Sequence, residues 1–207
     1  ETAEVKAAIL DPHGNLETEL FGRTDKDRIT LSGKINCPKL WNGVNSPGLY
    51  RAEITLFCNG EPVDSIEQEF GIRSYRIDAD NGFFLNGKPY PLHGVNYHQD
   101  SYESGWAMTG AQRERDYRII RDMGCTAVRM AHYQHCDHEY SLCDRLGLCV
   151  WTEIGIINKM SADDSDAHVL SDGFGDNAKQ QLRELIRQNY NHPSVIVWGL
   201  FNELYQM

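Results

Sequence analysis

The end of the chain places an amide and a carboxylate side by side after an apolar run. Asn202 and Glu203 follow the stretch "SVIVWGLF". A carboxyl group at the rim of an apolar strand is partly desolvated, which favours its protonated form and lets it act as a proton donor. The alternative is a solvated glutamate that opens the next helix, where acidic side chains suit the positive end of the helix dipole. Position alone leaves both interpretations of Glu203 open.

A second polar stretch, "RMAHYQHCDHEY", is rich in histidine. His132, His135 and His138, together with Cys136, first suggest metal ligands. Their spacing matches no closed zinc pattern, so a polar loop in which one or two histidines contact a substrate is the favoured interpretation. Arg129, at the end of the preceding apolar run, is expected to pair with a nearby carboxylate or, alternatively, to contact the substrate itself.

The third candidate stretch is "GVNYHQDSYESGW". Asn96, His98 and Asp100 lie close together in it and could bind a polar substrate, although Asn and Asp also favour turns. Trp106 could offer an aromatic face to a sugar ring or pack at the rim of the site, and both roles stay open. Trp151 and Trp198 lie inside strand-like runs and are predicted to fill the interior.

Residues 1–77 are predicted to form an antiparallel β-sandwich of the immunoglobulin type. Strand-like segments flank a turn signal at residues 11–15, and the alternating segments "RITLSGKI" and "YRAEITLF" follow. Asn59-Gly60 marks a hairpin, and "SIEQEFGIRSYRI" supplies one more strand. Because such a domain usually needs about 100 residues, we expect one or two of its strands to lie before the first residue of this chain.

Residues 78–207 are predicted to form the first four βα units of a (β/α)8 TIM barrel. Four apolar strand candidates, "PYPLHGVNY", "TAVRMA", "LCVWTEI" and "SVIVWGLF", alternate with three helices, which indicates a parallel sheet. The first helix is expected to begin with a capping box at Thr109, the second to span residues 139–145, and the third to span residues 175–191. Helical spacing predicts buried faces at Tyr117, Ile120 and Met123, and at Ala178, Leu182, Leu185, Ile186 and Tyr190. The polar stretches follow the carboxyl ends of the strands, where such barrels carry their active sites.

Composition and charge exclude several classes of partner. A net charge of -10 over 207 residues disfavours nucleic acid, since phosphate contacts need a basic surface. No run approaches the roughly 20 apolar residues of a membrane span, and the start, "ETAEVKAAIL", lacks the features of a signal peptide. A cytoplasmic or a periplasmic location fits these features. None of the six cysteines forms a C-x-x-C pair, so we expect buried free thiols rather than a disulfide framework.

Taken together, these stretches resemble glycoside hydrolase family 2, the group of β-galactosidases, β-glucuronidases and β-mannosidases. "LWNGVNSPGLYRAEITL" and "FGIRSYRID" resemble the end of the family's sandwich domain, and "NGFFLNGKPYPLHGVNYHQD" resembles the entry into its barrel. "AVRMAHYQHCDHEYSLCDRLGLCVWTEI" resembles the second and third barrel strands, and "NHPSVIVWGLFNE" the fourth. The resemblance covers the chain from about residue 38 to its end.

The resemblance implies roles for individual residues. Glu203 matches the family's general acid/base, and Asn202 matches the amide that hydrogen-bonds the sugar 2-hydroxyl. His98 and His132 match histidines that line the sugar pocket, and Arg129 matches a buried arginine that supports it. We expect Asp100 and Trp106 to contact the substrate as well. The family's "SHYP"-type motif reads "AHYQ" here, without its Ser and Pro.

Family resemblance also implies a reaction. Members are retaining exo-glycosidases with two catalytic carboxylates. The family's nucleophile is a glutamate on a later barrel strand, so we expect a partial chain that is inactive alone, and Glu153 has no nucleophile role in the family. The "NYHQD" loop favours β-D-galactosides as substrates. A β-glucuronidase or β-mannosidase is the alternative within the family, and a non-catalytic carbohydrate-binding or structural module is the alternative outside it.

The resemblance bears on cofactors and partners too. β-Galactosidases of the family hold magnesium with a Glu and a His beyond the third strand, and the matching positions here are Ile157 and Lys159, neither of which is a suitable ligand. No metal or other cofactor is therefore predicted. The expected partner is a carbohydrate substrate, with no nucleic acid and no membrane. A half-barrel leaves sheet edges and apolar surface uncovered, so we expect a homo-oligomer.

Overall fold

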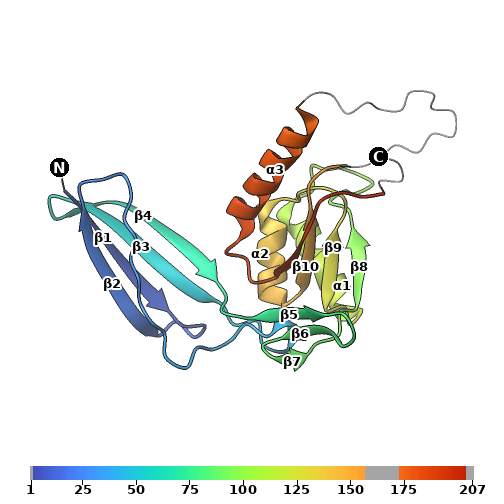
Figure 1. Ribbon diagram of the computed structural model, residues 1–207, viewed down its shortest axis with the longest axis horizontal. Coiled ribbons are helices and arrows are strands. Elements are labelled where there is room, and N and C mark those ends of the chain that lie inside the picture. Colours follow the sequence, from blue (N-terminus) through green and yellow to red (C-terminus); the bar gives the residue numbers. More distant parts are fainter. Residues whose placement is uncertain (1, 157–172, 204–207) are drawn as a thin grey trace.

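A computed structural model describes residues 2–156 and 173–203, which contain three sheets and three α-helices (Figure 1). The first sheet is antiparallel and has the strand order β2-β1-β3-β4. Its strands are β1 (Ala3–Leu10), β2 (Leu16–Thr24), β3 (Tyr50–Cys58) and β4 (Glu61–Phe70). Asn59 and Gly60 have φ angles of 53° and 84°, as a tight turn between paired antiparallel strands requires, so the predicted hairpin is confirmed. The described residues thus hold one sheet of the expected sandwich.

The segment "RITLSGKI" was predicted as a strand, and that prediction is wrong. Residues 28–35 belong to no strand. They pack against β2 through side chains instead: Ile29 and Leu31 atoms lie 2.6 Å from where a Cβ on Gly22 would stand, and Leu20 is equally close to Gly33. Alternating apolar residues give a segment one packing face. A segment that crosses a sheet needs that face as much as a hydrogen-bonded strand does.

The stretch "SIEQEFGIRSYRI" was expected to be one strand, but the chain breaks it in two. β4 ends at Phe70, and β5 (Tyr75–Asp78) begins a small sheet with β6 (Gly82–Leu85) and β7 (Lys88–Pro89). The break lies at Gly71, where a Cβ would stand 2.6 Å from Pro193 and 3.0 Å from the Cβ of Trp41. A glycine is needed for this close approach. A core formed by Trp41, Phe83, Leu85, Tyr90, Cys149 and Ile196 joins the small sheet to the next layer.

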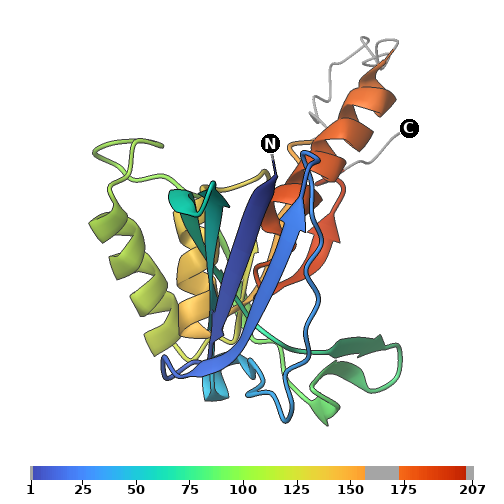
Figure 2. The ribbon, with the colours of Figure 1, turned by 90° about the vertical axis from the view of Figure 1, so that its left-hand side faces the viewer.

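The third sheet is parallel and has the order β11-β10-β9-β8, the reverse of the sequence order. Its strands are β8 (Gly94–Tyr97), β9 (Ala127–Met130), β10 (Cys149–Glu153) and β11 (Val195–Gly199). They alternate with α1 (Gly110–Asp122), α2 (Asp137–Leu146) and α3 (Phe174–Asn189). Helices α1 and α2 pack side by side (Figure 2). Sequential parallel strands with helical crossovers are the wall of a (β/α)8 barrel, so the predicted architecture is confirmed.

The helix ends follow the predicted signals. The Thr109 side chain accepts a hydrogen bond from the Gln112 backbone N–H, and the Gln112 side chain accepts one from the Thr109 backbone N–H, which completes the capping box. Gly147 ends α2 with a φ of 76° in the left-handed region. Burial differs from the prediction at Met123, which caps α1 and is exposed.

Helix α3 is less covered than its spacing predicted. Leu185 and Asn189 are its buried residues, whereas Ile186 and Tyr190 are exposed. The helix packs against β11, the edge strand of the parallel sheet. An edge strand covers a narrower stripe of a helix than a sheet centre does, so the outer part of the apolar face stays open.

Two further expectations concern membranes and cysteines. Among the helices of the described residues, none is long and apolar enough to cross a lipid bilayer. Cys125, Cys143 and Cys149 are buried with free thiols, as expected, whereas Cys37 is exposed and Cys58 and Cys136 are only partly buried. Burial raises the pKa of the Cys149 thiol to about 12, so this cysteine behaves as a core residue.

Candidate active site

The carboxyl ends of the four parallel strands meet at Arg129, near the end of β9. Its Nε and Nη2 donate to the two oxygens of Glu153, on β10, at 2.9 and 3.1 Å. Nη2 also donates to Oδ1 of Asn202, just beyond β11, at 2.9 Å, and Nη1 donates to Oδ1 of Asn96, on β8, at 3.4 Å. One guanidinium therefore ties side chains from all four strands together. Of the two interpretations of Arg129, the carboxylate pair is the one observed.

The Arg129–Glu153 pair is a buried ion pair of favourable geometry. Glu153 is 0% exposed, and a carboxylate without a partner at such a depth is costly. Two parallel N–H···O bonds to an arginine satisfy both oxygens and fix the relative orientation of the groups. The guanidinium also lies 5.5 Å from the centre of the Trp151 ring. The pair is thus a rigid support for the polar side chains next to it.

Asn202 is held in one orientation by this ion pair. Its Oδ1 accepts from Arg129, which leaves its Nδ2 group to donate elsewhere. Its backbone N–H donates to the carbonyl of Ile156 at 2.8 Å, and the residue is 8% exposed. The amide assignment follows from the hydrogen-bond network. Asn202 is therefore a fixed donor at the rim of the sheet.

Glu203, the next residue, is exposed. Of the two interpretations of its position, the partly desolvated carboxyl group is not observed, and Leu200 and Phe201 before it are about half exposed, at 49% and 50%. Glu203 has a φ of 52°, in the left-handed region that non-glycine residues seldom occupy. Backbone outliers of this kind cluster at functional sites.

Four rings gather on the loops that follow β8 and β9. His98 and His132 pack edge to face, with ring centres 5.2 Å apart. The Nδ1 of His98 lies 3.3 Å from the Tyr133 hydroxyl, and Trp106 stacks on the Tyr133 ring at 4.7 Å. The indole of Trp106 is still 62% exposed. The structure thus brings His98, His132 and Trp106 together.

Tyr133 links these side chains, and sequence reasoning gave it no role. The available signal was its place directly after His132 in "AHYQ". Asp100 lies on the same rim and is exposed, and its backbone N–H donates to the carbonyl of His98 at 2.9 Å. Burial, and then the negative charge of Asp100, raise the pKa of the Tyr133 phenol.

His132 connects the rings to the ion pair. Its Nδ1 lies 3.6 Å from Oε2 of Glu153, which is longer than a hydrogen bond. Within the described residues this buried nitrogen has no hydrogen-bond partner. The peptide bond between Ala131 and His132 is cis. A nitrogen that faces a buried carboxylate without bonding it can still bond a ligand group.

The histidine-rich stretch does not form a metal site in the described residues. His135 contacts Glu139 and His138 lies 3.9 Å from Glu114, so the three histidines have different partners. Across residues 2–156 and 173–203, no three His, Cys, Asp or Glu side chains are grouped for a metal ion. Ile157 and Lys159, on which the magnesium prediction depends, lie outside the described residues.

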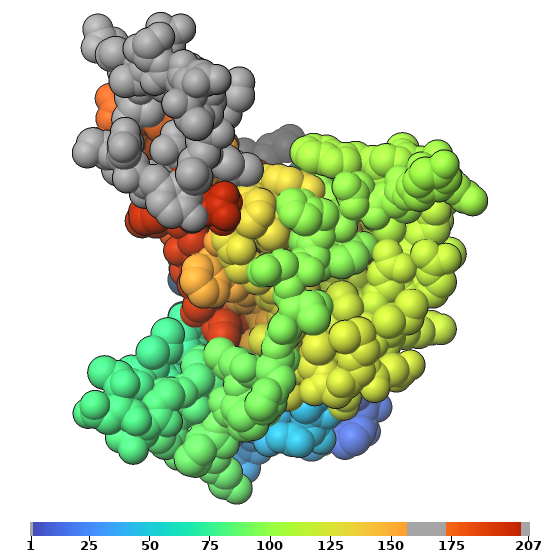
Figure 3. Space-filling view, turned by 90° about the vertical axis from the view of Figure 1, so that its right-hand side faces the viewer, coloured from blue at the N-terminus to red at the C-terminus, as the bar shows by residue number. Residues whose placement is uncertain are grey.

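The parallel sheet has a hollow next to the ion pair. A cavity of about 340 Å³ is lined by residues of β8, β9, β10 and β11, with Asn96, Arg129 and Trp151 among them. Figure 3 shows this side of the molecule, where orange and red atoms from the later strands lie in a recess above the green small sheet. The hollow runs along the open face of the sheet from the first residues of β8, β9 and β10 to Asn96 and Arg129, which reach it from the carboxyl-end side.

Parallel strands that alternate with helices and carry polar side chains at their carboxyl ends place this part of the chain in the (β/α)8 barrel class. The model of the family described as "Glycosyl hydrolases family 2, TIM barrel domain" matches residues 77–207, and "Glycosyl hydrolases family 2" matches residues 1–73. The chain belongs to glycoside hydrolase family 2.

Relatives with assigned names fall into two groups. The chain is 46% identical over 170 residues to a β-glucuronidase of Bacteroides fragilis, covering 82% of this chain and 24% of that protein. It is 30% identical over 209 residues to the β-galactosidase BoGH2A of Bacteroides ovatus, covering 99% of this chain and 24% of that protein. The chain thus spans about a quarter of the length of these curated relatives.

Solved structures agree with this placement. The chain is similar to the crystal structure of a Parabacteroides merdae β-glucuronidase, with a TM-score of 0.85 and 32% identity over 98% of this chain and 25% of that one. It is also similar to a Bacteroides uniformis β-glucuronidase, with a TM-score of 0.83 and 36% identity over 96% of this chain and 24% of that one.

Proposed function

We propose that the protein carrying this chain hydrolyses terminal β-glycosides with retention of configuration, and that Glu203 is its general acid/base. The observation that carries the proposal is the pair of adjacent side chains beyond the fourth parallel strand. Asn202 is fixed by Arg129 as a hydrogen-bond donor, and Glu203 extends beside it toward solvent. An amide next to a carboxylate at this end of a barrel suits a sugar whose hydroxyl and glycosidic oxygen are neighbours.

In the first step a nucleophilic carboxylate attacks the anomeric carbon, and the bond from that carbon to the glycosidic oxygen breaks. Glu203 donates its proton to the departing oxygen, so the leaving group departs as a neutral alcohol. In the second step Glu203, now a carboxylate, takes a proton from water. The water oxygen attacks the anomeric carbon and displaces the enzyme carboxylate.

Glu153 is not proposed as the nucleophile. Each of its oxygens accepts a hydrogen bond from Arg129, and the group is fully buried. A carboxylate whose two oxygens both accept hydrogen bonds from an arginine is a weak nucleophile toward carbon. We assign Glu153 and Arg129 a supporting role, in which they hold Asn202 and face His132.

The substrate contacts are proposed from the rim side chains. Asn202 would donate its Nδ2 hydrogens to the sugar 2-hydroxyl. His98, His132 and Asp100 would bond the other hydroxyls, and the exposed face of Trp106 would pack on the apolar face of the sugar or of its leaving group. The stacked Tyr133 ring supports Trp106 from behind.

Two sugars are candidates at this site. The carboxylate of Asp100 on the rim favours a neutral sugar such as β-galactose over an acidic one, because like charges repel. Arg129 would be the natural partner of a sugar carboxylate, but its Nε and Nη2 already donate to Glu153 and Asn202. In favour of β-glucuronides stands the identity to the Bacteroides fragilis β-glucuronidase. We propose β-galactosides first and β-glucuronides second.

The test uses the full-length protein and nitrophenyl glycosides of both sugars. Glu203→Gln should lower kcat about 100-fold to 10,000-fold for substrates with poor leaving groups. It should affect activated aryl glycosides much less, because a good leaving group needs no proton. Equal losses for both leaving-group classes would contradict the role of Glu203. Sugar binding without any turnover by the wild type would favour a non-catalytic carbohydrate-binding module.

A further inference from the structure

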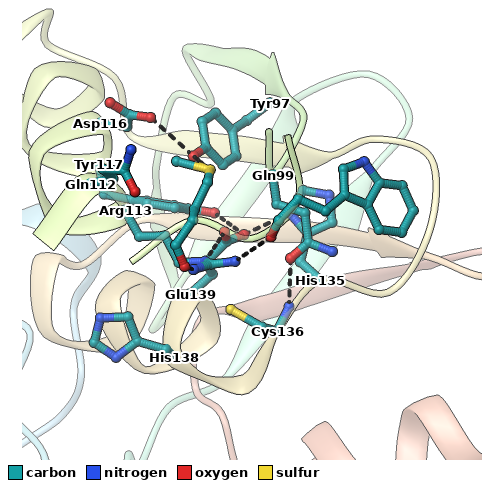
Figure 4. Close-up of polar contacts among 12 residues, drawn as sticks. Tyr97, Gln99, Gln112, Arg113, Asp116, Tyr117, His135, Cys136, His138 and Glu139 are labelled. Atoms are coloured by element: carbon teal, nitrogen blue, oxygen red, sulfur yellow. Dashed lines mark hydrogen bonds and ion pairs between the residues drawn. The ribbon is translucent and has the colours of Figure 1, made fainter. Parts of the chain in front are cut away.

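Two loops at the carboxyl end of the sheet, residues 98–109 after β8 and residues 131–136 after β9, are called the rim loops here. A buried cluster of charged and aromatic side chains lies beside them, outside the site described above. Its centre is the carboxylate of Glu139, in the first turn of α2, which is 0% exposed. Oε1 accepts from Arg113 Nε at 3.0 Å. Oε2 accepts from the Tyr117 hydroxyl at 3.2 Å and from His135 Nδ1 at 2.7 Å. Figure 4 shows these side chains converging on Glu139.

The outer donors of this cluster reach the backbone of two different rim loops. Arg113 donates through Nη2 to the carbonyl of Trp106 at 3.4 Å, and through Nη1 to the carbonyl of Met108. On the other side, Nε2 of His135 lies 3.2 Å from the carbonyl of Ala131, the residue before His132. Glu139 is thus connected through one side chain to Trp106 and through another to the neighbour of His132.

Ring packing connects the same two loops at the surface. The Tyr133 ring lies between Trp106, at 4.7 Å, and His135, at 5.1 Å between ring centres. Trp106 is therefore held twice, by its backbone through Arg113 and by its indole through Tyr133. Both loops depend on contacts that lead to one carboxylate.

Stability alone does not require such a cluster. Well-packed apolar residues in place of a buried ion pair are often neutral or stabilising. What a fully bonded polar network provides in addition is a single arrangement of the groups it contacts. Here two of the three partners of Glu139, Arg113 and His135, are bonded to the backbone of rim loops, and the third, Tyr117, packs in the core against Tyr97. The cluster is therefore placed to fix loop geometry rather than only to fill the core.

We infer that Glu139 is a positioning residue for the sugar site: through Arg113 and His135 it holds Trp106 and His132 in their places. The inference rests on the proposed function, in which those two side chains face the substrate. Glu139 itself touches no substrate, since it is fully buried.

Glu139→Gln is the informative substitution because it keeps the shape and removes the charge. The Gln Nε2 group cannot accept the hydrogen bonds that Glu139 receives, so Arg113 loses its counterion in a buried place. Both loops are then free to shift. Since a displacement of about 1 Å can cost about 100-fold in rate, kcat/KM per folded enzyme should fall about 100-fold, with a higher KM and a lower kcat.

Asp144 offers a matched control on the same helix. It is also buried and also accepts from a histidine, with His192 Nδ1 at 2.6 Å and the Ser194 backbone N–H at 3.0 Å. These partners precede β11, at the opposite end of the sheet from the rim loops. Asp144→Asn should therefore lower the melting temperature while kcat/KM per folded enzyme stays within about twofold.

The experiment compares wild type, Glu139→Gln and Asp144→Asn in the full-length protein. Steady-state kinetics with nitrophenyl β-galactoside and β-glucuronide are combined with hydrogen exchange of peptides covering residues 98–108 and 131–136. Exchange in both peptides should rise in Glu139→Gln and stay unchanged in Asp144→Asn. The double variant Arg113→Met with Glu139→Gln guards against misfolding, because it leaves no unpaired buried charge and keeps a side-chain oxygen that can accept from Tyr117 and His135. It should melt higher than Glu139→Gln alone yet show faster exchange in residues 98–108 and a lower kcat/KM.

Two results would overturn the inference. One is a Glu139→Gln enzyme with wild-type exchange in both loops, and the other is an equal loss of kcat/KM in Glu139→Gln and Asp144→Asn. A wild-type protein that hydrolyses neither glycoside would refute the proposed function instead. In that case the exchange data still decide whether Glu139 orders the two loops.

Discussion

The two ends of the parallel sheet use buried polar groups in different ways. At the amino ends of the strands, Asp144 and its neighbours bond to the backbone: Asp144 accepts from Ser194, its carbonyl accepts from Trp41 Nε1, and Arg73 donates to the carbonyls of Pro193 and Val195. These bonds join segments that are far apart in the sequence. Their effect is to hold the small sheet, α2 and β11 together.

At the carboxyl ends the hydrogen bonds run between side chains, and some polar groups keep unused hydrogen-bonding capacity. Arg129 binds Glu153 and Asn202, and the Asn202 amide keeps its Nδ2 group for another acceptor. His132 Nδ1 stays beyond hydrogen-bond distance of Glu153, at 3.6 Å. Comparison of the ends teaches that burial and charge alone do not mark a functional group. Unused bonding capacity alone does not mark one either, because the buried Oγ of Ser194 at the amino end also lacks a hydrogen-bond partner within the described residues. The carboxyl end differs because His132 and Asn202, with capacity to spare, lie beside the exposed side chains of His98 and Glu203.

The strongest test of this comparison is Arg129→Met. Removal of the guanidinium leaves the buried Glu153 carboxylate without its partner, which should cost about 3–5 kcal/mol of stability. Asn202 loses its anchor at the same time, so activity should fall as well. Thermal unfolding and steady-state kinetics of the full-length protein measure the two effects.

A double variant separates the charge from the packing at this position. Arg129→Met combined with Glu153→Gln should recover part of the lost stability, because no uncompensated charge is left, but little activity. If the free energy of unfolding of Arg129→Met lies within about 1 kcal/mol of the wild-type value, the ion pair at the carboxyl end is not a rigid support for the site.

Trp41→Phe tests the amino end and should have the next largest effect. Trp41 is fully buried, and the substitution leaves the Asp144 carbonyl without its Nε1 donor. We expect a loss of about 1–3 kcal/mol with unchanged kcat/KM in the folded enzyme. A clear change in KM would mean that the two ends are coupled.

Thr109→Ala tests the helix that follows the rim loop. The Thr109 side chain caps α1 by accepting from the Gln112 N–H. Loss of such a cap typically costs about 1 kcal/mol, and Thr109→Ser, which keeps the hydroxyl, should restore it. Urea unfolding of both variants gives the comparison. If the two variants were equally stable, the hydroxyl would contribute nothing.

Local signals predicted much of the fold. The capping box at Thr109, the left-handed Gly147 and the turn at Asn59-Gly60 each depend on neighbours a few residues away, and each is present. The alternation of strands and helices also placed the polar stretches at one end of the sheet. Failure came at "RITLSGKI", where the same alternation serves a segment that packs across β2.

Partners distant in sequence could not be predicted. Glu139 looked like an ordinary acidic residue in a first helical turn, yet its partner Arg113 lies 26 residues away and buries it completely. The bidentate pair of Arg129 with Glu153 likewise joins two strands. Only packing brings such groups together. The domain boundary after residue 77 and the catalytic role of Glu203 stay predictions.

His192 provides the smallest effect, a pH dependence confined to the amino end. Burial alone would lower the pKa of His192, but the hydrogen bond to Asp144 and the charges of Asp144 and Asp137 outweigh it and raise the pKa above the usual 6.5. A group whose pKa is raised on folding stabilises the fold fully below its unfolded pKa. That contribution is lost as the pH rises through the folded value.

The stability gap between wild type and His192→Gln should therefore be widest near pH 5.5 and shrink toward about pH 8.5. The glutamine keeps a donor for Asp144 but does not titrate in this range. Melting temperatures across the range measure the gap, and kcat/KM profiles of the two proteins should coincide, because the ionic partners of His192, Asp137 and Asp144, both belong to α2. A gap that widened with pH would mean that His192 is neutral in the folded protein. The amino end would then be held by the backbone bonds of Asp144, Trp41 and Arg73 without a charge pair.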